Sequence, residues 1–201
     1  MGRYTGPVCR FCRREGVKLC DKNKCATVKR NFPPGQHGQS RKGKPSDYSR
    51  QLREKQKARR KFGLSENQML RYYKTAVTSI DESGPRMLEE MERRLDNVIF
   101  RSGFASSRRQ ARQFVSHGLF SLNGQRVTVP SIQVKTGDSF TVREKNRPMP
   151  AFENLSKAGA NAPQWLTVEA AAYTGKVLSK PEKSDLESIL DSQMIIEFYS
   201  R

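Results

Sequence analysis

The chain has 201 residues, a formal net charge of +18 and 35% hydrophobic residues, which suggests one or two domains with modest cores. A positive charge of this size favours a polyanionic partner, and nucleic acid fits better than a membrane surface. No apolar run approaches the roughly 20 residues of a membrane helix, and the N-terminus lacks a signal-peptide apolar segment, so we expect no membrane association.

The positive charge is concentrated in two segments. Residues 1–62 contain 19 Lys and Arg against 4 Asp and Glu, and residues 94–147 contain 10 against 3. Residues 63–93 and 148–201 each carry a net charge of −2. We expect the two basic segments to contact nucleic acid and the two near-neutral segments to act as scaffold or as protein-facing surface.

Four cysteines lie close together near the N-terminus, as Cys9-x2-Cys12 followed by Cys20-x4-Cys25. Thiolates two residues apart can ligate one tetrahedral ion, and a short segment with few apolar residues needs such a staple. A basic, cytosolic-looking chain favours metal binding over disulfides. We predict a metal site formed by all four thiols, with Zn²⁺ as the natural occupant and an iron–sulfur cluster as the alternative that the spacing allows.

The next stretch, residues 33–38, is rich in proline and glycine and is predicted to be an irregular loop. We expect His37 to hydrogen-bond or stack on RNA, or to pack within the loop, rather than to ligate a metal. The candidate RNA-binding residues here are Gln36, His37, Arg41, Lys42 and Lys44.

A strongly basic helix is predicted from Ser46, its N-cap, to Phe62, with Gly63 at its end. It carries seven Lys and Arg against two acids, an imbalance that favours phosphate contact over a merely solvated face. Ser65 and Gln68 form a capping box for the following helix. The candidate RNA-binding residues of these helices are Tyr48, Arg50, Arg53, Lys57, Arg60 and Arg71.

Gly84-Pro85 begins another helix, which we expect to continue without a break past Leu95. Gly103 ends this pattern, and Ser106 or Ser107 caps a further helix. On that helix the apolar residues, Ala111, Phe114 and Val115, share one stripe that must be buried. The arginines 108, 109 and 112 are therefore predicted to occupy its exposed arc, close to an N-terminus that itself attracts phosphate.

Short strands follow this helix. Gly118 ends the helix, and Asn123-Gly124 between alternating runs predicts a hairpin of strands 120–122 and 126–129. A third strand covers 140–142. Asp138 fits a turn, whereas Asp96 can also orient nearby arginines. The candidate RNA-binding residues from 94 to 147 are Ser106, Ser107, Arg108, Arg109, Arg112, Gln113, Ser116, His117, Asn123 and Arg126.

After a linker at 147–150 and a short helix at 151–158, a hairpin is predicted around Thr174-Gly175. The C-terminal apolar residues should be buried, namely Ile195, Ile196, Phe198 and Tyr199. We expect this tail to pack on the helices of residues 46–92, so that the segment 94–147 is an insertion between two halves of one helical domain.

Several motifs resemble one family. Within 94–127 they are RLDN (94–97), SRRQARQ (107–113), SHG (116–118) and LNGQRV (122–127); elsewhere they are PPGQHG (33–38), PSDY (45–48), LREKQKAR (52–59) and IEFYSR (196–201). The chain thus resembles the S-four family of bacterial-type small-subunit ribosomal proteins, in the form with an N-terminal four-cysteine site.

The resemblance implies an α+β fold in three parts. These are a metal-binding basic extension (1–45), a mainly helical domain (46–93 plus 148–201), and an inserted α-L type RNA-binding module of two helices plus a short antiparallel sheet (94–147).

The implied role is that of a structural constituent of the cytoplasmic ribosome. The resemblance implies primary binding to small-subunit ribosomal RNA at a multi-helix junction, early in assembly. It further implies contact with the neighbouring protein S-five and with messenger RNA near the entry channel, an influence on decoding accuracy, and no homo-oligomer.

Two other classes are weaker. An RNA-modifying enzyme with the same module, such as a pseudouridine synthase, needs a catalytic domain, but only 54 residues follow residue 147. No nucleophile elbow, P-loop or dinucleotide-binding glycine pattern is present in the sequence. A zinc-finger regulator needs a base-reading helix beside the cysteines, where residues 26–45 are too rich in Pro and Gly.

Overall fold

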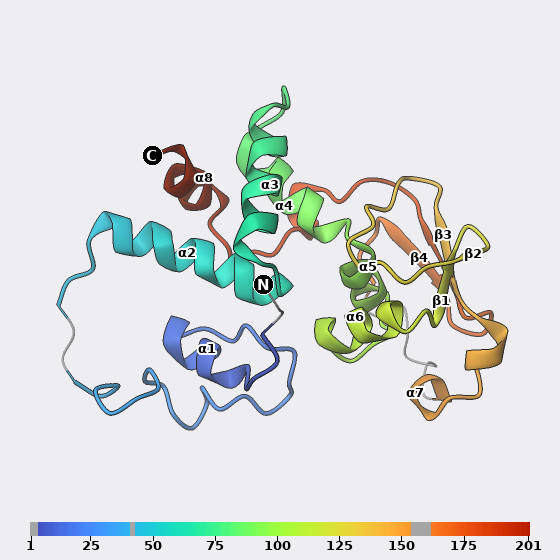
Figure 1. The fold of residues 1–201 in the computed structure, drawn as a ribbon, viewed down its shortest axis with the longest axis horizontal. Helices are drawn as coiled ribbons and strands as arrows, with labels where there is room; N and C mark the ends of the chain where they lie inside the picture. Colours follow the sequence, from blue (N-terminus) through green and yellow to red (C-terminus); the bar gives the residue numbers. More distant parts are fainter. Residues whose placement is uncertain (1–3, 41–42, 154–161) are drawn as a thin grey trace. The chain divides into compact units, whose positions relative to one another are not determined.

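A computed structural model describes residues 4–40, 43–153 and 162–201 (Figure 1). The chain divides into two units: a helical unit of Met1–Met87 with Glu187–Arg201, and a sheet unit of Leu88–Leu186. Among the described residues, no helix is both long enough and apolar enough to cross a membrane.

In the part of the chain that the structure describes, four helices lie wholly within the helical unit: α1 (Cys9–Glu15), α2 (Asp47–Phe62), α3 (Glu66–Val77) and α8 (Ser192–Ser200). The predicted caps are confirmed, because Ser46 accepts from the Ser49 N–H, Ser65 and Gln68 form a reciprocal capping box, and Gly63 ends α2 in the left-handed conformation. These signals are local and therefore readable from sequence.

The C-terminal helix α8 packs on α2 and α3, as predicted (Figure 1). The Tyr199 hydroxyl donates to Glu66 at 2.8 Å, and the Tyr73 and Tyr199 rings stack at 5.1 Å. Ile195 is buried, but Ile196, Phe198 and Tyr199 are only half-buried, so the prediction that all four are buried was wrong for three of them. A helix on the outside of a small unit buries only one stripe.

The helix α4 (Ser83–Glu92) does not continue past residue 92, so the prediction of an unbroken helix was wrong. Arg94 is extended and pairs with Gln133, and the Leu95 and Asp96 N–H groups donate to the carbonyls of Ile132 and Pro130. These long-range backbone hydrogen bonds replace helical ones, and α5 (Leu95–Arg101) then begins anew.

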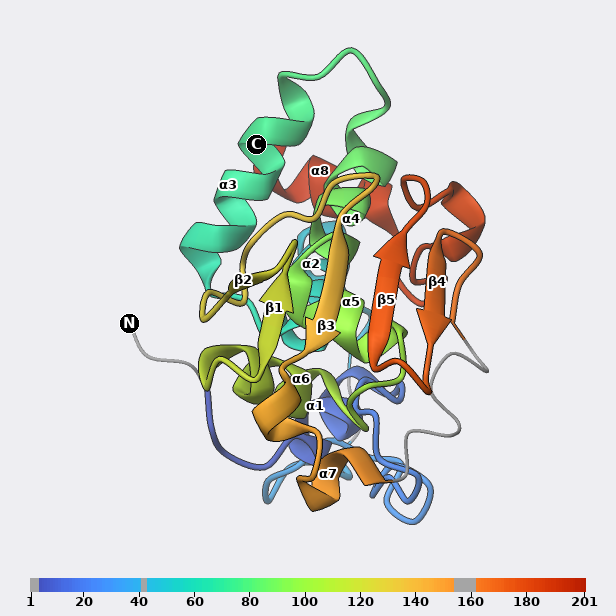
Figure 2. The same ribbon diagram turned by 90° about the vertical axis from the view of Figure 1, so that its right-hand side faces the viewer.

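The sheet unit contains a five-stranded antiparallel sheet in the order β2-β1-β3-β5-β4 (Figure 2). Its strands are β1 (Phe120–Leu122), β2 (Gln125–Arg126), β3 (Ser139–Val142), β4 (Leu166–Glu169) and β5 (Thr174–Val177). Asn123 and Gly124 join β1 to β2 with φ values of 50° and 81°, which confirms the predicted turn. The second strand has only two residues, whereas 126–129 was expected.

The β4–β5 hairpin lies in this sheet rather than with the helical unit, which corrects the predicted arrangement. Phe140 of β3 pairs with Gly175 of β5, and the Phe140 ring covers that glycine so closely that a Cβ would lie 2.3 Å from it. Only glycine leaves room for the ring. The hairpin joins the sheet because its addition covers the otherwise open edge of β3.

The helices α5 and α6 (Arg108–Ser116) cover one face of the sheet, and the core of the sheet unit lies between them (Figure 2). The predicted stripe of Ala111, Phe114 and Val115 is buried, as expected. Phe104 makes edge contacts with Phe120 and Phe140, at centroid distances of 5.9 and 6.0 Å.

Shorter elements complete the unit. They are η1 (Glu144–Asn146), α7 (Pro150–Glu153) and η3 (Lys183–Asp185). The predicted short helix at 151–158 coincides in part with α7, and its residues 154–158 lie outside the described residues.

Candidate nucleic-acid interface and cysteine cluster

The N-terminus of α6 is organised by two serines. Ser107 is the N-cap and accepts from the Gln110 N–H at 3.3 Å, while Ser106 donates its own N–H and hydroxyl to the Gln110 side chain, both at 2.7 Å. The Ser116 hydroxyl at the other end donates to the Arg112 carbonyl at 2.9 Å. Ser106, Gln113, Ser116 and His117 are exposed and line the solvent side of this helix.

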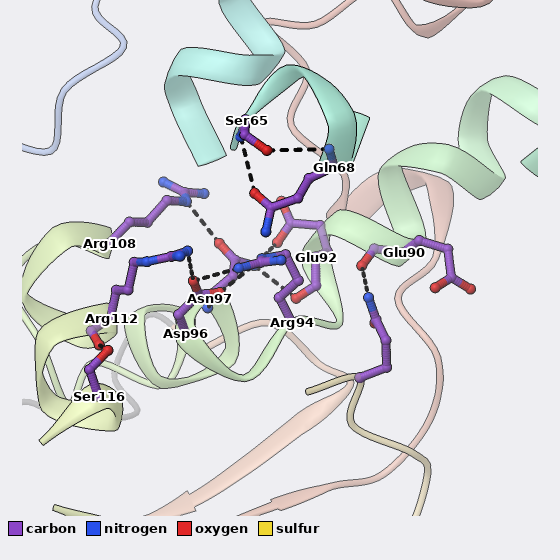
Figure 3. Close-up of polar contacts among 11 residues, drawn as sticks. Ser65, Gln68, Glu90, Glu92, Arg94, Asp96, Asn97, Arg108, Arg112 and Ser116 are labelled. Atoms are coloured by element: carbon purple, nitrogen blue, oxygen red, sulfur yellow. Dashed lines mark hydrogen bonds and ion pairs between the residues drawn. The ribbon is translucent and has the colours of Figure 1, made fainter. Parts of the chain in front are cut away.

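The arginines of α6 are not all on an exposed arc, which corrects the prediction. Arg108 is buried at 8% exposure, and its Nε donates to Asn97 Oδ1 at 2.8 Å (Figure 3). Its guanidinium lies 4.4 Å from the Phe100 ring centroid. Arg109 and Arg112 are both half-buried. Periodicity places a side chain on a helix face, but it does not reveal that the neighbouring α5 offers acceptors that draw an arginine inward.

Asp96 is the centre of one buried ion-pair group. Its two oxygens accept from Arg94 Nε at 3.0 Å and Nη2 at 2.9 Å, and one of them also accepts from Arg112 at 3.1 Å (Figure 3). The Asn97 N–H completes the set at 3.0 Å. The prediction that Asp96 orients nearby arginines is confirmed.

A second buried group joins Glu92 to Asn97 and Arg101. The Asn97 amide nitrogen donates to the Glu92 carbonyl at 2.9 Å and to its carboxylate, which also receives both Arg101 donors at 2.8 and 3.0 Å. Sequence reasoning noted Asn97 only within a family motif and missed the roles of Glu92 and Arg101. Charged residues on a helix are normally expected at the surface, so the sequence carried no signal for the burial of Glu92.

The hairpin residues Asn123 and Arg126 have structural contacts of their own. The Asn123 side chain donates to Asp138 at 2.9 Å and accepts from the Ser139 N–H at 2.9 Å, so it ties the β1–β2 turn to the start of β3. Arg126 is exposed and lies against Gly118, where a Cβ would be 2.5 Å from its Nε. Its guanidinium is therefore placed at the C-terminal end of α6, where a positive charge is favoured.

The basic helix α2 pairs many of its cations with carboxylates. Arg53 lies 3.5 Å from Glu15, Arg60 forms an ion pair with the same carboxylate, and Lys57 pairs with Glu54. Arg50 is exposed and lies 3.6 Å from Asp47, which is also exposed.

The other candidate residues of the helical unit are mostly exposed. Gln36, His37, Lys44, Tyr48 and Arg71 are in this group, and Arg41 and Lys42 lie outside the described residues. The Tyr48 ring lies 5.8 Å from the Phe198 ring. The described candidates therefore include both open side chains and side chains already engaged in ion pairs.

The four cysteines gather around α1. The Sγ atoms of Cys9, Cys20 and Cys25 all lie within 4.8 Å of one another. Cys12 is fully buried in the same apolar cluster as Cys20 and Cys25, and its Sγ accepts from the Leu19 N–H at 3.3 Å. This soft sulfur donor set fits Zn²⁺ or an iron–sulfur cluster.

The thiols differ in acidity. Burial raises the pKa of Cys12, and burial raises the pKa of Cys20 to about 12. Burial acts in the same direction on Cys25, but hydrogen bonds with the Thr27 side chain and backbone and with the Cys20 and Cys12 thiols together outweigh it and lower the pKa of Cys25 to about 7. A bound cation would favour the thiolate form of all the ligands.

Two family models match the chain in succession. Residues 3–92 match the ribosomal protein S4/S9 N-terminal domain, and residues 93–140 match the S4 domain. The matched domains, with the basic helices and the capped helix α6, define a ribosomal protein of the S4-domain class.

Full-length relatives then identify the family. The chain is 47% identical to the small ribosomal subunit protein uS4 of Natranaerobius thermophilus and 48% identical to that of Geotalea daltonii, with both chains fully covered in each case. It is also 48% identical over full length to uS4A of Symbiobacterium thermophilum. The protein belongs to the uS4 family, the S-four family that its sequence motifs resemble.

Proposed function

We propose that this protein is a structural constituent of the small ribosomal subunit and binds the RNA of that subunit. The observation that carries this conclusion is the full-length identity of 47–48% to uS4 proteins of the small subunit. Since uS4 proteins are structural ribosomal proteins, the protein is not an enzyme. The two strongly basic segments supply the charge that RNA backbone binding requires.

The proposed RNA contacts fall into two groups. The first group consists of exposed side chains: Gln36, His37, Lys44, Tyr48, Arg50, Arg71, Ser106, Gln113, Ser116, His117, Asn123 and Arg126. The second group is half-buried or buried: Arg53, Lys57, Arg60, Ser107, Arg108, Arg109 and Arg112. A rigid surface that mixes Arg with short polar groups suits folded RNA, which is recognised through shape, phosphates and 2′-hydroxyls. Arg41 and Lys42 are proposed contacts on sequence grounds alone.

The finer role proposed is organisation of a multi-helix RNA junction early in assembly. The near-neutral segments 63–93 and 148–201 support contact with a protein neighbour, for which S-five is our proposal. The basic residues around Lys44 support contact with messenger RNA at the entry channel, and with it an influence on translational accuracy.

The cysteine cluster is proposed to hold one Zn²⁺, with an iron–sulfur cluster as the alternative. The support is the mutual approach of three thiol ligands within 4.8 Å and the burial of the fourth cysteine beside them. The ion would act as a structural staple, because α1 has only seven residues and short helices are unstable alone.

Crosslinking tests the function directly. The purified protein is irradiated with total cellular RNA, and the crosslinked RNA and peptides are both sequenced. We expect small-subunit ribosomal RNA to dominate, with crosslinked peptides from α2 and from residues 106–126. Crosslinks spread over messenger or transfer RNA, with no enrichment of ribosomal RNA, would reject the proposal.

A further inference from the structure

Glu15, the last residue of α1, is in an unusual position for an acid. Its side chain is 1% exposed, and it lies between two arginines of α2, 3.5 Å from Arg53 and in a closer ion pair with Arg60. Phe11, also on α1, lies under the Arg60 guanidinium at 4.6 Å from the ring centroid. The helix that carries Cys9 and Cys12 thus also holds two cations of the basic helix.

The Glu15 carboxylate is only partly hydrogen-bonded. One carboxylate oxygen of Glu15, Oε2, is buried and has no hydrogen-bond partner among the described residues. Burial raises the pKa of Glu15 against the opposing effect of Arg53, Arg60 and Lys57. The attraction in a buried ion pair compensates for the cost of desolvating its charges only if the remaining lone pairs are also hydrogen-bonded. Because Glu15 lacks one such hydrogen bond, another anion can compete with it for Arg53 and Arg60.

We propose that Glu15 is a specificity-determining residue, which competes with RNA phosphate for Arg53 and Arg60. Carboxylate and phosphate bind guanidinium through the same paired N–H donors, so the two anions exclude one another at these side chains. The inference rests on the proposed RNA-binding function and concerns which RNA these arginines accept.

The competition discriminates between RNAs. Glu15 is held beside the arginines by α1, so its effective concentration is high and an isolated phosphate does not displace it. A folded RNA held by many other contacts can place phosphates against Arg53 and Arg60 and take Glu15's place. Flexible RNA without this geometry does not displace Glu15, so it makes no contact with Arg53 or Arg60. Glu15 thereby selects for folded RNA.

The test compares two RNAs by the slope of log affinity against log salt. The probes are small-subunit ribosomal RNA and single-stranded poly(U), and the variants are Glu15→Gln, the pair Arg53→Ala with Arg60→Ala, and all three together. Glu169→Gln is the charge control, because it removes one exposed acid from β4. Glu15→Leu is a second variant that lacks the competing carboxylate, and its apolar side chain fills the buried position. Circular dichroism verifies that each variant is folded.

We expect Arg53 and Arg60 to contribute to the salt dependence of binding for ribosomal RNA but not for poly(U). In the parent, Arg53→Ala with Arg60→Ala should flatten the slope for ribosomal RNA and leave the slope for poly(U) unchanged. Glu15→Gln and Glu15→Leu should steepen the poly(U) slope by about 1.4, since each new single-strand phosphate contact adds about 0.7. The triple variant should return to the parent's poly(U) slope.

Two results would overturn the inference: a poly(U) slope for Glu15→Gln and Glu15→Leu equal to that of Glu169→Gln, or a steep slope that persists in the triple variant. If instead the parent shows no preference for ribosomal RNA over poly(U), the proposed function itself fails. The two failures are thereby distinguished.

Discussion

Arg108 and Arg109 are neighbours on α6 that differ in burial, since Arg108 is buried and Arg109 is half-buried. We predict that removing Arg108 lowers stability and that removing Arg109 lowers RNA affinity. Arg108→Ala should destabilise the sheet unit by about 1–3 kcal/mol, because the buried Asn97 Oδ1 loses its donor. Arg109→Ala should cost RNA affinity on the order of 1 kcal/mol with little loss of stability. Urea unfolding and RNA titration of both variants measure the two quantities. Equal stability losses would show that the two side chains do not differ in role.

Phe114 lies on the buried side of α6 and is the counterpart of Arg109 in this test. It is 8% exposed and its ring lies 5.2 Å from that of Phe152. Phe114→Ala should lower the free energy of unfolding by roughly 3–5 kcal/mol, since it leaves a cavity in the core. RNA binding should fail only where thermal melts show the unit unfolded. A folded variant that cannot bind RNA would mean that Phe114 faces the RNA.

At the level of elements, helices were predictable and their long-range partners were not. The caps Ser46, Ser65 and Ser107 act on N–H groups within three residues, so the sequence contains the whole interaction. The pairing of β5 with β3 joins residues about 35 positions apart, and no local pattern encodes it.

The same distinction applies to the candidate sites. The cysteine cluster follows from spacing along the chain, and three of the four predicted thiols lie within 4.8 Å of one another. The pairing of Arg53 and Arg60 with Glu15 depends on how α1 packs on α2. A count of charges along α2 cannot reveal a carboxylate supplied by another helix.

The docking of α8 should depend on pH through Glu66. Its carboxylate lies partly buried, and burial alone would raise its pKa, but hydrogen bonds from Lys55 and Tyr199 outweigh burial and lower the pKa below 4.5. A lowered folded-state pKa stabilises the unit above pH 4.5, and this contribution is lost as the pH falls through the folded-state value. As the pH is lowered below about 4.5, the urea midpoint of the parent should therefore decrease more steeply than that of Glu66→Gln. Parallel curves for the two proteins would contradict the assignment.

At the level of the whole molecule, the cysteine cluster and the sheet unit have separate cores. The cluster consists of Cys12, Leu19, Cys20 and Cys25 with a few flanking residues, whereas the core of the sheet unit lies within residues 95–177. A metal held by the thiols can therefore stabilise the first without being needed by the second.

Removing the metal should unfold one part of the chain and spare the other. Elemental analysis of the purified protein should find about one zinc, or the iron of one cluster. Chelation, or Cys12→Ser, should abolish hydrogen-exchange protection in α1, because a seven-residue helix does not persist without its staple. Amides of β1, β3 and α5 should keep their protection and serve as the internal control. Protein without zinc or iron, with all four thiols reactive under native anaerobic conditions, would reject the site, and loss of protection in both places would show that the cores are coupled.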